Sequence, residues 1–179
     1  MADYFTPTTV EPEIPDGDMT ALERLLLSNI FETERYHGKT YLFSSEGPSD
    51  MSYVARSELA AALAASETIA SATNNFIKEQ LAANKDDAGD IELDMSVTGW
   101  TFVFQDIIRR SATIPYMIVK SAFTCTKMRP DGFGGMVTLI TADDVMAKST
   151  YDLIEEFEAK VTGDATNRGA QQNTSDGAS

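Results

Sequence analysis

Residues 116–141 hold the feature that most constrains the fold, because two β-rich runs are joined there by a loop of turn-forming residues. The runs are Tyr116 to Lys127 and Met136 to Thr141, and the loop between them contains Pro130, Asp131 and several glycines. β-Branched and aromatic residues favour strands, whereas Pro, Asp and Gly favour turns. The pattern predicts a long β-hairpin and therefore an antiparallel sheet.

The alternation of side chains along this hairpin predicts which of them are buried. The residues expected to point into the core are Phe123, Cys125, Val137 and Leu139. We expect Lys120 and Thr138 to face water instead. The hairpin would then pack one face against the helices of the fold.

Several other segments predict helices and short strands. Thr20 and Glu23 have the spacing of a capping box, and leucines follow at helical intervals. Ser57 and Ser66 are candidate N-caps for a helical stretch that reaches residue 83. The remaining expected elements are strands at 39–45 and 91–95, a helix at 100–110 with Asp106 on its solvent side, and a last helix from Thr141 to Phe157. For 100–110, strand propensity is also high, so both structures stay open.

These elements predict the α+β class, with a small, mostly antiparallel sheet that includes the 116–141 hairpin and is packed by helices. A mixed sheet stays open, because helices separate some strands. We expect one domain over residues 1–160, with an extended N-terminal arm at 1–18, where Pro7, Pro12 and Pro15 disfavour helix. Residues 161–179 contain no large apolar side chain after Val161 and predict a disordered tail.

Charge is sorted into blocks along the chain, and the net charge is −14. Residues 86–106 carry six carboxylates and no base, and residues 107–130 carry five bases and no acid. A field of this sign repels nucleic acid and attracts basic surfaces. We therefore expect no direct nucleic-acid binding, and a basic protein partner instead.

The composition also favours a cytoplasmic protein. Cys125 is the single cysteine, so no disulfide forms within the chain, and a free thiol suits a reducing compartment. No apolar run approaches the roughly 18 residues of a membrane span, and the N-terminus has no secretory pattern. We expect no membrane association, and the sequence leaves the oligomeric state open.

The first candidate site is the acidic run that precedes the basic block. Its expected partner-binding residues are Asp86, Asp87, Asp90, Glu92 and Asp94. No base lies among them, so their charges reinforce one another over the ~8 Å that a field reaches at physiological salt.

The alternative site is the glycine-rich loop of the hairpin at 127–135. Successive backbone N–H groups at glycines can form an anion-binding nest, and neighbouring bases would strengthen it. The residues of this candidate anion site are Lys127, Arg129, Gly132, Gly134 and Gly135. The loop matches no phosphate-binding motif, and a plain hairpin connection explains its glycines equally well.

Catalytic and metal-binding patterns are weak. Cys125 and His37 are the only residues of their types, and neither has a local signature of a nucleophile or its base. One Cys and one His cannot fill a tetrahedral zinc site, and the acidic segments do not match a calcium loop. We expect no catalytic residue, metal or cofactor.

Three segments resemble a known group of proteins. They are residues 18–28, residues 123–135 and residues 140–144. In these segments the chain resembles small acidic proteins encoded on plasmids and phage-like elements of proteobacteria, a group without an assigned activity. The likeness covers about residues 1–160. It implies a mobile-element context and supplies no functional residue.

Two functions follow as hypotheses. The first is a non-enzymatic acidic module that binds a basic protein, in the manner of inhibitors that mimic nucleic-acid charge against a host enzyme. The second is a small-anion-binding or catalytic module built on the 127–135 loop. Carboxylates lying along one surface would favour the first, and a concave pocket with inward-pointing bases would favour the second.

Overall fold

The structure is a computed structural model and describes residues 2–84, 89–96 and 99–172. The fold is α+β, as the sequence predicts, with a seven-stranded sheet, a separate two-stranded sheet and five helices. Of the last helix, only the side chains up to Gly163 are described.

The main sheet is antiparallel throughout, so the mixed alternative is not realised. Its order is β3-β4-β2-β7-β8-β9, and the short β1 pairs with one end of β7. The strands of this sheet are β1 (Tyr4–Phe5), β2 (Thr8–Pro15), β3 (Glu32–Tyr36), β4 (Lys39–Ser44), β7 (Met117–Cys125), β8 (Gly134–Ile140) and β9 (Val145–Ser149). The predicted hairpin is confirmed as β7 and β8, which pair from Met117 with Ile140 to Phe123 with Gly134.

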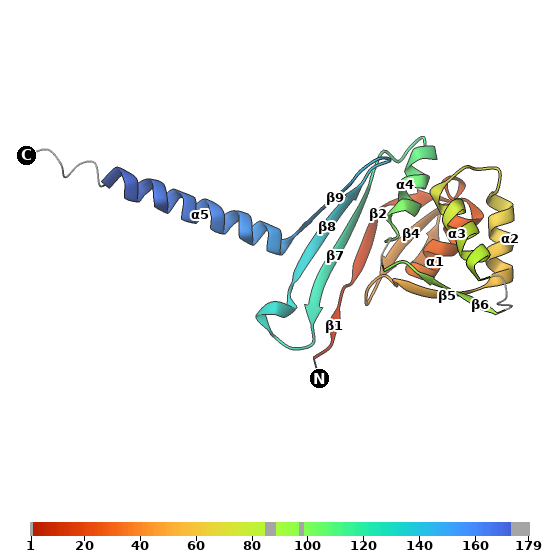
Figure 1. Cartoon of the computed structure of the whole chain (residues 1–179), viewed down its shortest axis with the longest axis horizontal. Helices are drawn as coiled ribbons and strands as arrows, with labels where there is room; N and C mark the ends of the chain where they lie inside the picture. Colours follow the sequence, from red (N-terminus) through yellow and green to blue (C-terminus); the bar gives the residue numbers. More distant parts are fainter. Residues whose placement is uncertain (1, 85–88, 97–98, 173–179) are drawn as a thin grey trace, which may run out of the picture.

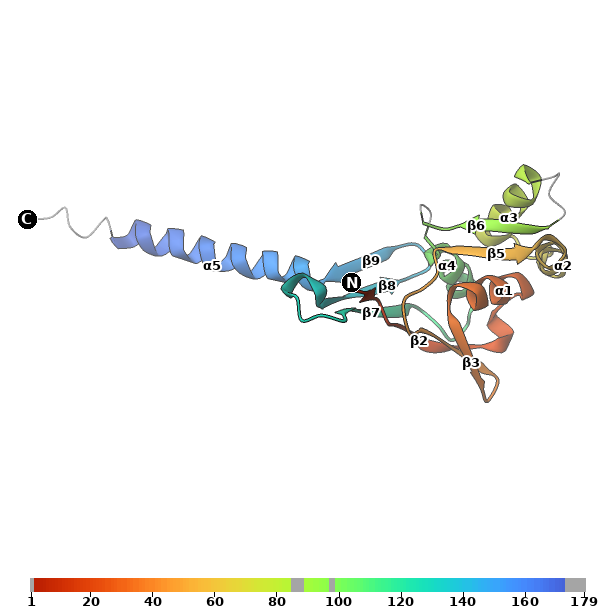
Figure 2. The same cartoon turned by 90° about the horizontal axis from the view of Figure 1, so that it is seen from below.

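Four helices and the second sheet form one end of the molecule, beside β2 and β4 (Figure 1). The helices are α1 (Ala21–Ile30), α2 (Arg56–Ser66), α3 (Ala72–Ala83) and α4 (Thr101–Arg110), and the small sheet pairs β5 (Met51–Ala55) with β6 (Asp90–Asp94). The fifth helix, α5 (Thr150–Gln172), projects away from this body on the side of β9, which both views show (Figures 1 and 2). Two short 3-10 turns, Asp16–Asp18 and Pro130–Gly132, complete the chain.

The core lies between the helices and the inner face of the sheet. Leu22 and Leu26 of α1, Phe104 and Ile107 of α4, and Leu93 of β6 are fully buried. The rings of Phe31, Trp100 and Phe104 pack at centroid separations of 5.2 to 5.9 Å. Residues 100–110 are thus helical because their apolar stripe faces this core.

The helix starts differ in how well local sequence predicts them. The capping box of Thr20 and Glu23 is confirmed, with both of its hydrogen bonds present. Ser57 and Ser66 do not cap helices; Ser71 is the N-cap of α3, and Ser66 is the last residue of α2. The Ser66 hydroxyl instead accepts a hydrogen bond from the Leu22 amide of α1, 3.1 Å away, and so joins two helices.

The predicted burial of β8 is out of phase by one residue. Val137 is 49% exposed, whereas Thr138 is 7% exposed, which is the reverse of the expectation. Thr138 pairs with Val119 of β7, and directly paired residues share a face of the sheet, so the register of the hairpin turns Thr138 inward. Lys120 is exposed as predicted, while Phe123, Cys125 and Leu139 are only half-buried.

The predicted helix start at Thr141 is wrong. Thr141 and Asp144 form a turn in which the Asp144 amide donates to the Thr141 hydroxyl (3.0 Å), and β9 follows. The helix begins nine residues later at Thr150, and Ser149 and Asp152 exchange hydrogen bonds between side chain and amide at its start. The same short pattern occurs twice, and only the second instance caps a helix.

The two ends of the chain also differ from the sequence expectations. The N-terminal arm is extended, but it contributes β2, which is paired on both sides by β4 and β7. At the other end α5 continues to Gln172, so secondary structure does not stop at residue 161. The rest of the expected tail, 173–179, lies outside the described residues.

Candidate functional site

The outward face of the β5–β6 ribbon carries three of the five predicted partner-binding carboxylates. We call Asp90, Glu92 and Asp94 the acidic face. Ile91 and Leu93, which alternate with them, are buried, and this burial fixes the carboxylates on the outside. Asp86 and Asp87 lie outside the described residues.

The partner strand determines the surroundings of the acidic face. Met51, Tyr53 and Ala55 stand directly opposite Asp94, Glu92 and Asp90. Met51 and Tyr53 are themselves exposed, so an aromatic and a thioether side chain line the carboxylates. The row therefore combines negative charge with apolar contact area.

Hydrogen bonds at the acidic face shift the pKa values of Tyr53 and Asp94. The Tyr53 hydroxyl donates to Glu92 Oε2 at 3.0 Å, and this bond to the carboxylate raises the pKa of Tyr53. Ser96 hydrogen bonds to Asp94, with its amide 2.8 Å from Oδ1, and these contacts lower the pKa of Asp94. Within the described part of the chain, no lysine or arginine pairs with the acidic face. Its charge is therefore directed at solvent.

The 127–135 loop is built differently from an anion nest. The Gly132 amide donates to the Arg129 carbonyl at 3.0 Å, and the Gly135 amide donates to the Thr150 hydroxyl at 3.2 Å. Arg129 pairs with Asp131 at 3.5 Å. Lys127 and Arg129 are exposed and line none of the hollows described for this structure. These donors bond within the loop, bond to the start of α5 or face solvent, and they do not converge on a ligand position.

Close packing explains two of the loop glycines. A Cβ at Gly132 would lie 2.6 Å from the Cβ of Cys125, and one at Gly134 would lie 2.6 Å from the hydroxyl oxygen of Thr150. Neither glycine has a positive φ, so conformational freedom is not the reason for them. The loop packs tightly against the ends of β7 and α5.

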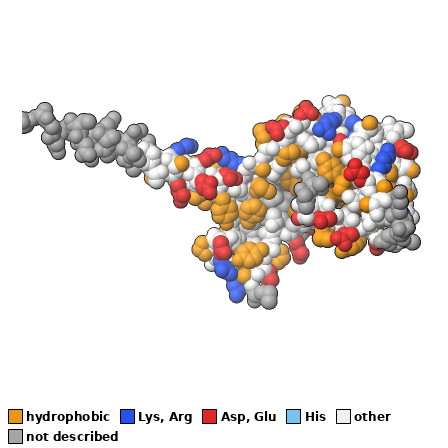
Figure 3. Space-filling view, in the orientation of Figure 1, with side chains coloured by type: hydrophobic (Ala, Val, Ile, Leu, Met, Phe, Trp, Pro, Cys, Tyr) orange, Lys and Arg blue, Asp and Glu red, His pale blue; other side chains and the backbone are white. Residues whose placement is uncertain are grey.

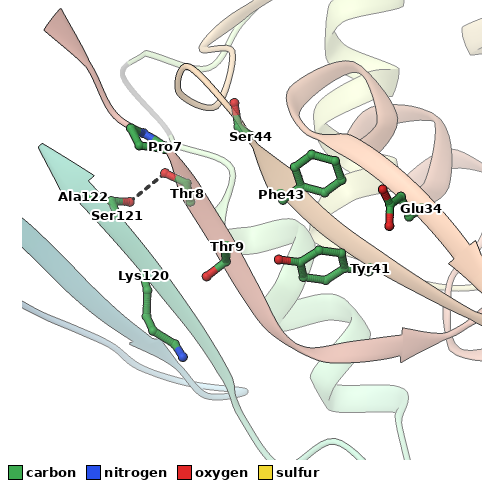
Figure 4. A pocket seen from close by; sticks show the side chains of 10 residues that line it. All are labelled: Pro7, Thr8, Thr9, Glu34, Tyr41, Phe43, Ser44, Lys120, Ser121 and Ala122. Carbon is green, nitrogen blue, oxygen red and sulfur yellow. Dashed lines mark hydrogen bonds between the residues drawn. The ribbon is translucent and has the colours of Figure 1, made fainter. Parts of the chain in front are cut away.

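Of the hollows described for this structure, the largest lies on the outer face of the sheet, which the helices do not cover, and it was not among the predicted sites. It measures about 560 Å³ and is lined by residues of β2, β3, β4 and β7 (Figure 4). The rings of Tyr41 and Phe43 stack there at 5.4 Å, and the Thr8 and Ser121 hydroxyls hydrogen bond at 2.9 Å. The alternation of Tyr41 and Phe43 around buried Leu42 was the available signal.

Lys120 and Glu34 bring opposite charges to this hollow (Figure 4). Lys120 is already paired with Glu11 at 2.7 Å. The hollow is broad and open, and it holds no set of converging polar groups of one sign. Its geometry therefore defines neither a catalytic centre nor a charged-ligand site.

His37 and Cys125 lie far apart, at opposite ends of the main sheet. His37 lies in the β3–β4 turn, beside the end of the sheet where Lys39 pairs with Pro15. Cys125 pairs with Tyr4 at the opposite end. Among the described residues, no three His, Cys, Asp or Glu side chains are grouped as a metal site would need. The helices in that part of the chain are all too short or too polar to span a lipid bilayer.

Comparison with known proteins gives no relative from which a role could be transferred. No family model, no curated protein and no solved structure matches the chain.

Proposed function

We propose that this protein is a non-enzymatic, acidic protein-binding module whose acidic face docks on a basic surface of its partner. The observation that supports this function best is the row of Asp90, Glu92 and Asp94 along one face of β6, exposed and without a paired cation in the described residues. The net charge of −14 adds a long-range attraction toward such a partner.

The spacing of the row suits a partner that binds nucleic acid. Alternate residues of a strand are about 6.6 to 6.8 Å apart. Phosphates on one DNA strand advance about 3.4 Å along the axis, but they lie farther apart in space because the backbone winds around that axis, so the carboxylates of the row are spaced comparably to neighbouring phosphates. An inhibitor that occupies the nucleic-acid site of a host enzyme would use this arrangement.

Tyr53 gives the face a feature that a bare acidic surface lacks. Its ring is exposed beside Glu92, and its hydroxyl hydrogen bonds to that carboxylate. Tyrosine and arginine are common anchors in interfaces, because they combine apolar area with directional hydrogen bonds. An arginine of the partner would contact the Glu92 carboxylate and the Tyr53 ring together.

The experiment compares two variants that lose the same charge. One carries Asp90→Asn, Glu92→Gln and Asp94→Asn; the control carries Glu13→Gln, Glu34→Gln and Glu67→Gln, all at exposed positions elsewhere. Each protein is immobilised, and proteins from a host lysate are captured at low and at moderate salt.

A partner retained by wild type and by the control, but lost from the acidic-face variant, supports the proposal. Its association rate with wild type should fall steeply with salt, as expected when surface charges steer encounter. If both variants lose the partner to the same degree, binding depends on the net charge of the protein and not on the acidic face. If all three proteins retain the partner equally, the acidic face is not its binding site.

A further inference from the structure

The two edges of the main sheet have opposite character. One edge is β3, with the sequence Glu-Thr-Glu-Arg-Tyr, and the other is β9, with the sequence Val-Met-Ala-Lys-Ser. Edge strands carry unpaired backbone N–H and C=O groups, and charged side chains are the usual protection against pairing with another strand. β3 is protected in this way, whereas β9 carries the single charge of Lys148.

Apolar exposure is concentrated around the unprotected edge. Nine of the sixteen exposed large apolar side chains among the described residues lie between residues 136 and 161. Val145 and Met146 are 39% and 52% exposed, although they point to opposite faces of the sheet. Figure 3 shows apolar side chains where α5 leaves the β8–β9 ribbon. Contiguous exposed apolar patches are typical of interaction surfaces.

We propose that β9 pairs antiparallel with β9 of a second copy of this chain, about a two-fold axis that passes beside Ala147. This register pairs all five residues of both strands. It places Val145 opposite Ser149 of the second copy, Met146 opposite Lys148 of the second copy, and Ala147 opposite itself. The two main sheets become one continuous sheet, joined by an isologous contact.

Charge explains why a second copy fits this edge. No like charges stand opposite one another in the register, and the stem of Lys148 covers Met146 of the second copy. Within its own chain Lys148 pairs with Glu156 of α5 at 2.6 Å, which neutralises the one charge of this edge, and Asp144 of the second copy lies diagonally from Lys148. The same symmetric pairing at β3 would put Glu34 opposite Glu34, which like-charge repulsion disfavours.

The position of α5 agrees with this arrangement. The helix starts directly after Ser149 and projects from the β9 edge, away from its own body (Figures 1 and 2). That is the side on which the second copy lies. Leu153, Ile154 and Phe157 of α5 are exposed in the single chain, so a second copy on this side can cover them. The carboxylates of Asp152, Glu155 and Glu158 disfavour direct pairing of two α5 helices, so the strand edge is the centre of the contact.

Dimerisation goes beyond the proposed function and does not depend on it. The axis lies at the end of the molecule opposite β5–β6 (Figure 1), so both acidic faces stay accessible. Two faces on one particle would raise the avidity for a repeated basic partner. Dimerisation can be tested with this protein alone, so the outcome is independent of the lysate experiment.

Cross-linking at the axis tests the register. In a Cys125→Ser background, Ala147→Cys places two thiols opposite one another, with Cα atoms about 4.5 to 5.5 Å apart, inside the range of disulfides. Lys148→Cys in the same background is the matched control, because its two copies lie about 8 Å apart, too far to bridge. Mild oxidation should give a covalent dimer with Ala147→Cys and little with Lys148→Cys.

Sedimentation equilibrium over a wide range of protein concentration tests the association itself. Wild type should be a dimer, and Met146→Lys should raise its dissociation constant about tenfold or more, because a lysine then faces Lys148 of the second copy twice per dimer. A wild-type protein that stays monomeric at all concentrations overturns the proposal, and so does equal cross-linking of the two cysteine variants. A dimer that Met146→Lys leaves unchanged would place the interface elsewhere and would also overturn it.

Discussion

Glu23 of α1 and Arg110 at the end of α4 form an ion pair inside the helical layer, 87 residues apart in the sequence. The Glu23 side chain is fully buried, and Arg110 is 25% exposed. One carboxylate oxygen accepts from Arg110 and from the Thr20 amide, while Oε1 has no hydrogen-bond partner among the residues that the structure describes. The pair ties the first helix to the last helix of the body.

Removing the arginine should destabilise the fold more than removing both partners. Arg110→Met leaves a buried carboxylate without its cation, and the expected cost is about 3 to 5 kcal/mol. The double variant Glu23→Gln, Arg110→Met should recover part of this loss. Urea unfolding of the double-mutant cycle measures the coupling. Arg129→Met, at an exposed ion pair, is the control and should change stability by less than about 1 kcal/mol.

Stability should depend on pH through Glu23. Burial raises the pKa of Glu23 in the folded protein above its unfolded value of about 4.3. Its contribution to stability is therefore fully present below about pH 4.3 and is lost as the pH rises through the folded pKa. The difference in unfolding free energy between wild type and Glu23→Gln should fall over that interval and then stay constant. Unfolding from about pH 4 to about pH 8 checks it; a difference that rises with pH contradicts it.

Asp106 should be essential for the docking of α3. Its Oδ2 accepts from the Thr73 amide at 2.8 Å and from the Thr73 hydroxyl at 2.7 Å. Asp106→Ala would leave both donors buried without a partner, at a cost of about 1 to 3 kcal/mol. Thermal unfolding measures the loss, with exposed Asp143→Ala as the control. Equal melting temperatures for both variants would mean that water replaces the carboxylate.

Local sequence predicted the elements of the fold better than their environments. The capping box at Thr20 and the 116–141 hairpin depend on neighbouring residues, and both were predictable. Asp106 was expected in water, but its partner Thr73 is 33 residues away, beyond the reach of any helical periodicity. The stretch after Asp144 fits both strand and helix patterns, and pairing with β8 decides for β9.

The candidate site likewise has features that local sequence predicts and features that it does not. The alternation of Asp90, Glu92 and Asp94 with buried Ile91 and Leu93 was visible in the sequence, so the acidic face could be predicted. For the hollow beside Tyr41 and Phe43, alternation indicates only that both rings share one face of β4, because β2 and β7 reach the hollow from distant parts of the chain. The unprotected edge at β9 depends on the strand order, which local patterns do not contain.

The phase of β8 can be tested with a matched pair of aspartates. Thr138→Asp would bury a carboxylate beside Val119, and we expect it to destabilise the protein by several kcal/mol or to prevent folding. Val137→Asp puts the same charge on the outer face, opposite Lys120, and should change stability by less than about 1 kcal/mol. Circular dichroism and thermal unfolding compare the two. The reverse order would restore the phase that the sequence alone suggested.

Deleting residues 162–179 should leave the stability of the fold unchanged. The segment contains no large apolar side chain, so its removal loses almost no hydrophobic burial. The described polar contacts of α5 with the rest of the protein come from residues before the deletion: the Thr150 hydroxyl accepts from Gly135, Tyr151 donates to the Asp131 carbonyl, and Glu156 pairs with Lys148. Val161, the last large apolar residue before the deletion, is 70% exposed. The melting temperatures of the two proteins should agree at matched concentration, and a fall of more than about 5 °C, on the order of 1 kcal/mol for a chain of this size, would show that the deleted residues pack against the body.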